Sequence, residues 1–127
     1  MNSTKPKTIA FDLDDVLCRR DEKATGPQKY LTCKPIFEMI SIVNKCYEEG
    51  MIIKIYTARG QCTFHGDVSK IYANLFELTT KHLREWGVKY HQLIMGKPHY
   101  DLLIDDKAMD SRDVKSLIDI EERLENA

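Results

Sequence analysis

The sequence has no excess of basic residues, no long apolar run and no Cys-x-x-Cys pair. Its 127 residues carry 19 Lys and Arg against 20 Asp and Glu, a formal net charge of −1, whereas a nucleic-acid-binding surface usually needs a basic excess. The polar segment of residues 1–8 lacks the apolar core of a signal peptide, and the apolar runs elsewhere are too short to cross a bilayer. The four cysteines are therefore expected to be reduced. We expect a cytoplasmic protein that binds neither nucleic acid nor membrane.

The composition and the order of local patterns predict one α/β domain over residues 1–127. A hydrophobic content of 43% and a charged content of 31% are typical of a soluble globular protein. Strand and helix patterns alternate along the chain, which favours a mainly parallel sheet flanked by helices. Strands are predicted over residues 8–11, 51–56, 90–95 and 101–104. Helices are predicted to start at Pro35, to span residues 68–86 and to start near Ser111, and a polar loop with Gly26-Pro27 covers residues 19–33.

Polar side chains follow each of the four predicted strands. In chain order they are Asp12 with Asp14, Thr57, Lys97, and Asp105 with Asp106. Because ligands bind outside the carboxyl ends of strands in open α/β sheets, we expect one crevice that contains acids, a hydroxyl and an amine. Paired carboxylates are unfavourable to bury without a cation, and oxygen ligands suit Mg²⁺. The alternative, a solvated acidic turn at Asp12 and Asp14, does not account for the other three strand ends.

This ordered set resembles the haloacid dehalogenase-like (HAD) superfamily, most of whose members are Mg²⁺-dependent phosphatases. The four motifs of that superfamily resemble Asp12-Leu13-Asp14-Asp15-Val16, Thr57, Lys97 and Ile104-Asp105-Asp106. The chain departs from the pattern at Val16, where many members have Thr. The resemblance extends to the small capsule-biosynthesis phosphatase subfamily through Thr57-Ala58-Arg59, Gly96-Lys97-Pro98 and Asp105-Asp106-Lys107-Ala108, and it covers roughly residues 8–113.

The resemblance implies a Rossmann-like HAD core without a cap domain and a hydrolase that forms an aspartyl-phosphate. Asp12 would be the nucleophile that attacks phosphorus. Asp14 would act as general acid and base, protonating the leaving oxygen and then activating water. The cofactor Mg²⁺ would be held by the carboxylate of Asp12, the backbone carbonyl of Asp14, and Asp105.

Further residues would bind the substrate or support the site. The hydroxyl of Thr57 would donate to a phosphate oxygen, Lys97 would balance the charge of the transferring group, and Arg59 would bind the phosphate or an acidic sugar group. Asp106 and Asp110 would support the metal or the lysine. Each residue also has a simpler interpretation: a turn cap for Thr57, an exposed loop cation for Lys97, an exposed surface arginine for Arg59, and a cap of the last helix for Asp110, where we favour the capping role or a mixture of both roles.

The subfamily resemblance implies a small sugar or polyol phosphate as substrate, in capsule or polysaccharide precursor synthesis. The alternatives are a phosphatase acting on a nucleotide or a nucleic-acid 3′-phosphate, and a non-catalytic HAD-fold binding protein. Without a cap, the site either accepts a large substrate or is covered by a neighbouring subunit. We therefore predict a homo-oligomer in which loops around Arg19-Arg20 or His65 shield the site. Cys46 falls on the apolar side of a predicted helix, where a core role is expected.

Overall fold

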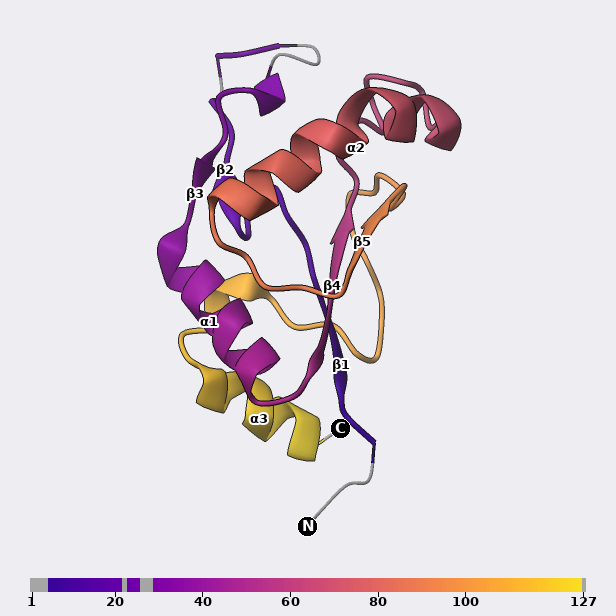
Figure 1. The fold of residues 1–127 in the computed structure, drawn as a ribbon. Helices are drawn as coiled ribbons and strands as arrows, with labels where there is room; N and C mark the ends of the chain where they lie inside the picture. The colour runs from indigo at the N-terminus through magenta and orange to yellow at the C-terminus, as the bar shows by residue number, and fades with distance from the viewer. Residues whose placement is uncertain (1–4, 22, 26–28, 127) are drawn as a thin grey trace.

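A three-stranded parallel sheet forms the centre of the structure (Figure 1). The computed structural model describes residues 5–21, 23–25 and 29–126. Strands β1 (Thr8–Phe11), β4 (Ile52–Thr57) and β5 (Gln92–Met95) lie in the order β1-β4-β5. Thr8 lies opposite Ile52, and Thr57 lies opposite Met95. The strands predicted over residues 8–11, 51–56 and 90–95 are therefore confirmed, as is their parallel pairing.

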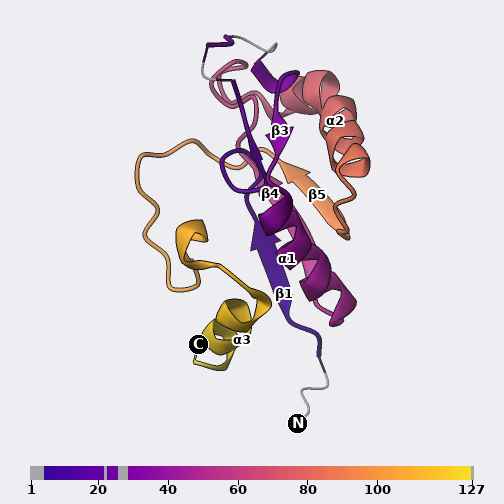
Figure 2. The same ribbon diagram turned by 90° about the vertical axis from the view of Figure 1, so that its left-hand side faces the viewer.

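Helices connect the strands in the way that a Rossmann-like α/β fold requires. Helix α1 (Phe37–Glu48) leads from β1 to β4, and α2 (Val68–Glu85) leads from β4 to β5. Right-handed crossovers in one direction put both helices on one side of a sheet, and Figure 2 shows them there, with residues 96–110 on the other side. Helix α3 (Leu117–Glu125) packs against α1. None of the helices in the described part of the chain is both long and apolar enough to cross a membrane.

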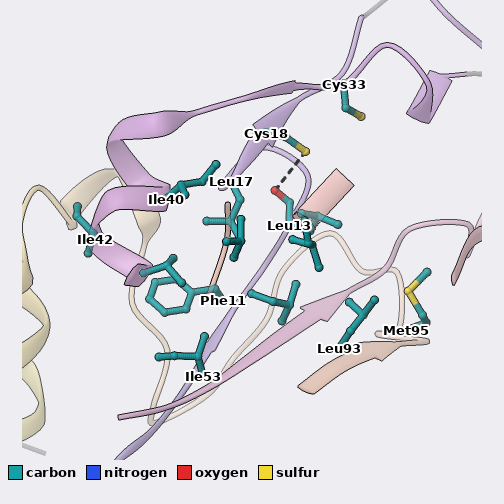
Figure 3. Close-up of a cluster of buried hydrophobic side chains, with 14 of the residues drawn as sticks. Phe11, Leu13, Leu17, Cys18, Cys33, Ile40, Ile42, Ile53, Leu93 and Met95 are labelled. Carbon is teal, nitrogen blue, oxygen red and sulfur yellow. Dashed lines mark hydrogen bonds between the residues drawn. The ribbon is translucent and has the colours of Figure 1, made fainter. Parts of the chain in front are cut away.

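The buried core lies between the sheet and α1 and extends under the loop that follows β1 (Figure 3). Ile53 and Ile55 of β4 are fully buried, as is Cys46 of α1, which confirms the core role predicted for that cysteine. Leu13 and Leu17 are also fully buried on either side of the acidic turn. Burying large aliphatic side chains is worth about 1.5–3 kcal/mol each, so these leucines fix the loop that carries Asp14.

The start of the first helix differs from the prediction. Pro35 belongs to β3 (Lys34–Pro35), which pairs with β2 (Cys18–Arg19) in a small antiparallel sheet, and it lies opposite Cys18. Helix α1 begins two residues later, at Phe37. Proline suits both places, because it has no N–H to offer to either the first helical turn or the outer edge of a strand pair. Gly26-Pro27 of the predicted polar loop lies outside the described residues.

The predicted fourth strand is wrong, and so is the start predicted for the last helix. Residues 101–104 form no ladder, and Leu102 and Ile104 are 75% and 90% exposed. A short apolar run becomes a strand only where a neighbouring strand and a covering layer receive it. Near the C-terminus, the 3₁₀ turn η2 (Ser111–Asp113) precedes α3, which starts only at Leu117. There the carboxylate of Asp119 accepts a hydrogen bond from the Ser116 N–H at 3.1 Å, which fixes the later start.

Candidate active site

The carboxyl ends of all three parallel strands meet at Asp12 and Lys97. Asp12 follows β1, and one of its carboxylate oxygens accepts the N–H of Leu13 at 2.8 Å. The other oxygen lies 3.3 Å from Nζ of Lys97, which follows β5. The backbone N–H of Lys97 in turn donates to the carbonyl of Thr57 at the end of β4, at 3.0 Å. The sheet therefore brings together Asp12, Thr57 and Lys97, as predicted, although they are far apart in the sequence.

Lys97 is held as a cation beside Asp12. Its side chain is 14% exposed, and Nζ lies 5.8 Å and 5.3 Å from the ring centres of Tyr56 and Tyr100. Burial works to lower the pKa of Lys97, but interaction with the Tyr100 hydroxyl and the charge of Asp12 outweigh it and raise that pKa. The interpretation of Lys97 as an exposed loop cation is therefore wrong. The ammonium of Lys97 is therefore a fixed positive charge beside Asp12 that is suited to binding an anion.

Thr57 is 1% exposed and has two roles at the end of β4. Its Oγ1 accepts the backbone N–H of Arg59 at 3.0 Å, which is the turn-capping contact that the sequence allowed. A hydroxyl has one proton to donate as well as lone pairs to accept with. No hydrogen bond within the described part of the chain takes that proton, so it remains available to a phosphate oxygen.

A tight turn after β1 sets the direction of Asp14. The carbonyl of Leu13 accepts the N–H of Leu17 at 2.8 Å, and the N–H of Asp15 donates to the carbonyl of Cys18 at 2.7 Å. Asp15 has a φ of 71°, in the left-handed region that Asp and Asn tolerate better than most residues. Its carboxylate lies 3.6 Å from Arg20 at the surface. Asp15 is therefore a turn residue.

Arg59 is buried, and two of its guanidinium nitrogens donate hydrogen bonds to the carboxylate of Asp14. Nη2 lies 2.9 Å from one oxygen and Nε lies 3.2 Å from the other, which is the bidentate geometry that gives arginine–carboxylate pairs their strength. Nη1 contacts the Thr79 hydroxyl and Nδ1 of His82, each at 3.2 Å. The ring of Tyr30 lies 4.9 Å from the guanidinium carbon. Protein partners thus surround all three guanidinium nitrogens.

This placement corrects the interpretations that the sequence offered for Arg59. The residue is 2% exposed, so it is not a surface arginine. To contact a substrate phosphate, as predicted, its guanidinium would have to leave the partly buried carboxylate of Asp14. The residue after it helps to hold it in place: the N–H of Gly60 donates to the Tyr30 hydroxyl at 2.9 Å, and a Cβ at Gly60 would lie 2.6 Å from Leu75. We therefore assign Arg59 to the positioning of Asp14.

The ion pair sets the protonation state of Asp14. Burial alone would raise its pKa, but the hydrogen bonds and charge of Arg59 dominate and lower that pKa below its usual value. The pKa of Arg59 is raised: burial works to lower it, and its contacts with Asp14 outweigh that effect. At neutral pH the carboxyl of Asp14 is therefore ionised, the form that accepts a proton.

His82 supports the ion pair as a neutral imidazole. Arg59 has only donors to offer, so Nδ1 of His82 must accept and the ring proton belongs on Nε2. Burial and the charge of Arg59 both lower the pKa of His82. The imidazole also stacks on Trp86 with ring centres 4.8 Å apart. Helix α2 therefore contributes a neutral acceptor to the guanidinium.

Two cysteine sulfurs lie against the same ion pair. A carboxylate oxygen of Asp14 and the sulfurs of Cys18 and Cys33 all lie within 4.8 Å of one another. Within residues 5–21, 23–25 and 29–126 this is the one group of three or more side chains that could together hold a metal ion. Nη2 of Arg59 lies 3.7 Å from Sγ of Cys18 and 3.6 Å from Sγ of Cys33. Thiolates are soft ligands that Mg²⁺ does not prefer, and the guanidinium already supplies the local positive charge. This group is therefore not a magnesium site.

Among the described residues, no hydrogen bond or ion pair joins the acidic side chains of the 105–110 segment to Asp12 or Lys97, and all three side chains are exposed. Asp105 is exposed, and its carboxylate accepts the N–H of Lys107 at 2.9 Å, a contact that lowers its pKa. The side chain of Asp106 is also exposed. Asp110 caps η2 by accepting the N–H of Arg112 at 2.9 Å. The guanidinium of Arg112 lies 2.6 Å from the Asp110 carboxylate and lowers the pKa of Asp110 to about 2. Asp110 therefore caps a 3₁₀ turn and not, as predicted, the last helix, because α3 starts later and has Ser116 as its N-cap.

The donor chemistry at the carboxyl end of β1 nevertheless suits a hard cation. The side chain of Asp12 is 38% exposed, and it offers carboxylate oxygens of the kind that Mg²⁺ prefers. The Asp14 carbonyl follows two residues later, and Asp105 has the same donor chemistry. The residues therefore fit Mg²⁺ by type, while Asp105 makes no described contact with Asp12.

The sequence analysis did not identify the residues that contact Arg59. Thr79 and His82 lie on the buried face of α2 with Ile71, Leu75 and Leu83. Two polar residues on an apolar helical stripe are a usable signal, because buried polar groups need partners. The pattern does not say which partner. Cys18 and Cys33 gave no such signal, since their separation matches no metal-binding motif.

Comparisons with known proteins support the α/β fold but indicate no function. No family model matches the chain, and no curated protein matches it. A crystal structure of a structural-genomics target protein from Vibrio cholerae superposes with a TM-score of 0.78 at 27% sequence identity, over 94% of this chain and 98% of the other. The similarity thus extends over nearly the whole of both chains.

Proposed function

We propose that this chain is a Mg²⁺-dependent phosphomonoester hydrolase of the HAD type, with Asp12 as nucleophile. The observation that carries the proposal is the contact of 3.3 Å between Asp12 and Lys97, tied to Thr57 at the carboxyl ends of three parallel strands. A carboxylate, an ammonium and a hydroxyl with a free proton are the groups that covalent phosphoryl transfer needs. The similarity of these positions to the four HAD motifs adds the reaction type.

Each group has one task in the proposed reaction. A carboxylate oxygen of Asp12 attacks phosphorus, the bond from phosphorus to the leaving oxygen breaks, and an aspartyl-phosphate results. The hydroxyl of Thr57 donates to a phosphate oxygen. The ammonium of Lys97 balances the charge of the nucleophile and the phosphate, where a preorganised charge is worth most. Water then attacks the phosphorus of the intermediate and releases inorganic phosphate.

Asp14 would exchange the proton in both steps. As a carboxylate held by Arg59, it is ready to take a proton from the attacking water. To protonate the leaving oxygen first, it must enter the reaction in its protonated form, which the guanidinium opposes. Arg59 therefore lowers the protonated fraction of Asp14 while fixing its orientation. Because a weakly basic leaving oxygen needs less help from a protonated Asp14, phosphate release should be faster for substrates with such a leaving group.

Mg²⁺ would be held by the carboxylate of Asp12, the backbone carbonyl of Asp14, and Asp105. When bound, the ion would neutralise part of the phosphate charge and orient the phosphate. The exposed segment 101–110 would have to approach the end of β1 for Asp105 to take part. Asp106 would support Asp105 as its chain neighbour.

For the substrate we propose a small sugar or polyol phosphate, used in capsule or polysaccharide precursor synthesis. The support for this class is the resemblance to the capsule-biosynthesis phosphatases. The net charge of −1 agrees with a small substrate better than with a nucleic-acid polymer. We also propose a homo-oligomer that shields the site, which light scattering coupled to size-exclusion chromatography would test.

Phosphate release from a panel of sugar, polyol and nucleotide phosphates, with Mg²⁺ and with EDTA, tests the proposal. The wild type should release phosphate only with the metal, and Asp12→Asn should abolish release. The matched control is Asp15→Asn, which removes a carboxylate from the same turn and keeps a residue that tolerates its φ of 71°. The control should retain activity. Equal activity of Asp12→Asn and wild type would exclude Asp12 as nucleophile, and no release from any phosphate in the panel would favour a binding role.

A further inference from the structure

We propose that Cys18 and Cys33 form a reversible disulfide that controls the proposed phosphatase site, an effect that rests on the proposed function. Their sulfurs lie within 4.8 Å of each other, and Figure 3 shows the two side chains together at one edge of the buried cluster. They come from opposite sides of the β2–β3 pair, since Cys18 lies in β2 and Cys33 directly precedes β3. Because Cys18 lies opposite Pro35, Cys33 is its diagonal neighbour across the two-stranded ribbon.

The surroundings of the two sulfurs favour exchange chemistry at this place. Nη2 of Arg59 lies within 3.7 Å of both sulfurs and favours negative charge on them, while the Asp14 carboxylate beside the same sulfurs opposes it. Cys18 is fully buried, whereas Cys33 is 9% exposed, so an oxidant reaches Cys33 first. Cys33 also lies just outside the β2–β3 ladder, where its backbone can adjust to disulfide geometry. Of the other two cysteines, Cys46 is a buried residue of α1 and Cys62 is exposed.

The oxidation needs a two-electron oxidant, for which we name a peroxide. The Cys33 sulfur attacks the O–O bond of hydrogen peroxide, which yields a sulfenic acid and water. The Cys18 sulfur then attacks the Cys33 sulfur, the S–O bond breaks, and the disulfide forms as a second water is released. Both sulfurs are oxidised and the peroxide is reduced. A dithiol such as dithiothreitol reverses the bond by exchange.

The disulfide changes the environment of Asp14 directly. In the reduced protein both thiols donate to the same Asp14 oxygen, Cys18 at 3.4 Å and Cys33 at 3.7 Å. A disulfide has no S–H to donate, and its sulfurs are about 2.05 Å apart. Forming it draws the sulfurs together beneath the guanidinium of Arg59. Asp14 thus loses two donors while the partner that orients it moves.

Intact mass and peptide mapping of the full chain test the bond without any activity assay. After treatment with hydrogen peroxide and alkylation under denaturing conditions, wild type should lose two hydrogen atoms, take up two alkyl groups instead of four, and yield a cross-linked Cys18–Cys33 peptide. Cys62→Ser and Cys46→Ser should still form it, and Cys18→Ser and Cys33→Ser should not. Full alkylation of Cys18 and Cys33 after oxidation, or pairing of either with Cys62, would overturn the proposal.

Phosphate release measures the control of the site separately. Oxidised wild type and oxidised Cys62→Ser should lose at least tenfold in rate, on the order of 1.4 kcal/mol, and dithiothreitol should restore it. An oxidised protein that carries the Cys18–Cys33 bond at full activity would refute the control. If the reduced protein released no phosphate at all, the proposed function would fail and the control would fail with it, while the mass result would still decide whether the bond exists.

Discussion

Replacing Arg59 with Met should cost the fold about 3–5 kcal/mol, the usual cost of removing one partner from a buried ion pair. The Arg59 side chain is completely buried and that of Asp14 is 12% exposed, so the carboxylate left behind cannot be hydrated fully. Thr79 and His82 would each lose a hydrogen-bond donor as well. Small domains are stable by only about 5–15 kcal/mol, so the loss is a large share of the total. Urea unfolding at neutral pH, followed by circular dichroism, measures it.

The matched control is Arg112→Met, which removes an arginine from an ion pair of 2.6 Å whose arginine side chain is 88% exposed. That pair is shorter, but water screens it, so the control should unfold close to the wild-type urea concentration. Arg59→Lys provides a second variant that keeps the charge and loses the bidentate contact. A loss below about 1 kcal/mol for Arg59→Met would refute the view that this pair stabilises the fold.

The pH dependence of the same variant should change sign. In wild type the pKa of Asp14 is lowered, so as pH falls below about 4 the unfolded chain binds the proton first and stability is lost. Without Arg59, burial dominates and raises the pKa of Asp14, so the folded variant binds the proton first and gains stability. The difference between the two proteins should therefore shrink as pH falls from about 7 toward 4. A constant difference would contradict the assignment to Asp14.

Two further predictions concern His82 and Lys97. The pKa of His82 is lowered by burial and by the charge of Arg59, so stability should fall as pH drops below about 6.5, where the unfolded chain binds the proton first. His82→Asn, which keeps an acceptor toward the arginine, should remove that loss in urea titrations between about pH 7 and 5. Lys97→Met should slow phosphate release by about 100- to 1000-fold, the usual cost of losing one charge-stabilising donor. A reduction of less than about tenfold would exclude that role.

The sheet and its polar edge could be predicted because they depend on local patterns. The strands before Asp12 and before Thr57 contain β-branched and apolar runs that predict a strand without any knowledge of the rest of the fold. Once those strands are parallel, their carboxyl ends must meet, which brings Lys97 to Asp12 without any knowledge of the contact itself. Residues 101–104 show the limit of this reasoning. They have the same composition as a buried strand, and they lie exposed because no neighbouring strand pairs with them.

The role of Arg59 could not be predicted from the sequence. Its partner Asp14 is 45 positions away, and its other contacts come from a helix and from the loop around Tyr30. An arginine two residues after a strand has the same local pattern whether it faces water or a buried carboxylate. Only the fold, which brings Thr79 and His82 of α2 to the guanidinium of Arg59, decides between them. The same holds for Cys18 and Cys33, which meet because β2 and β3 pair.

The most direct test of the account is the covalent state of Asp12 during turnover. Wild type mixed with its best substrate from the panel and Mg²⁺, then quenched in acid within the first turnover, should yield a phosphorylated peptide that contains Asp12. Asp15→Asn should yield the same adduct, and Asp12→Asn should yield none. Phosphate release by a wild-type enzyme that never carries phosphate on Asp12 would contradict the proposed mechanism.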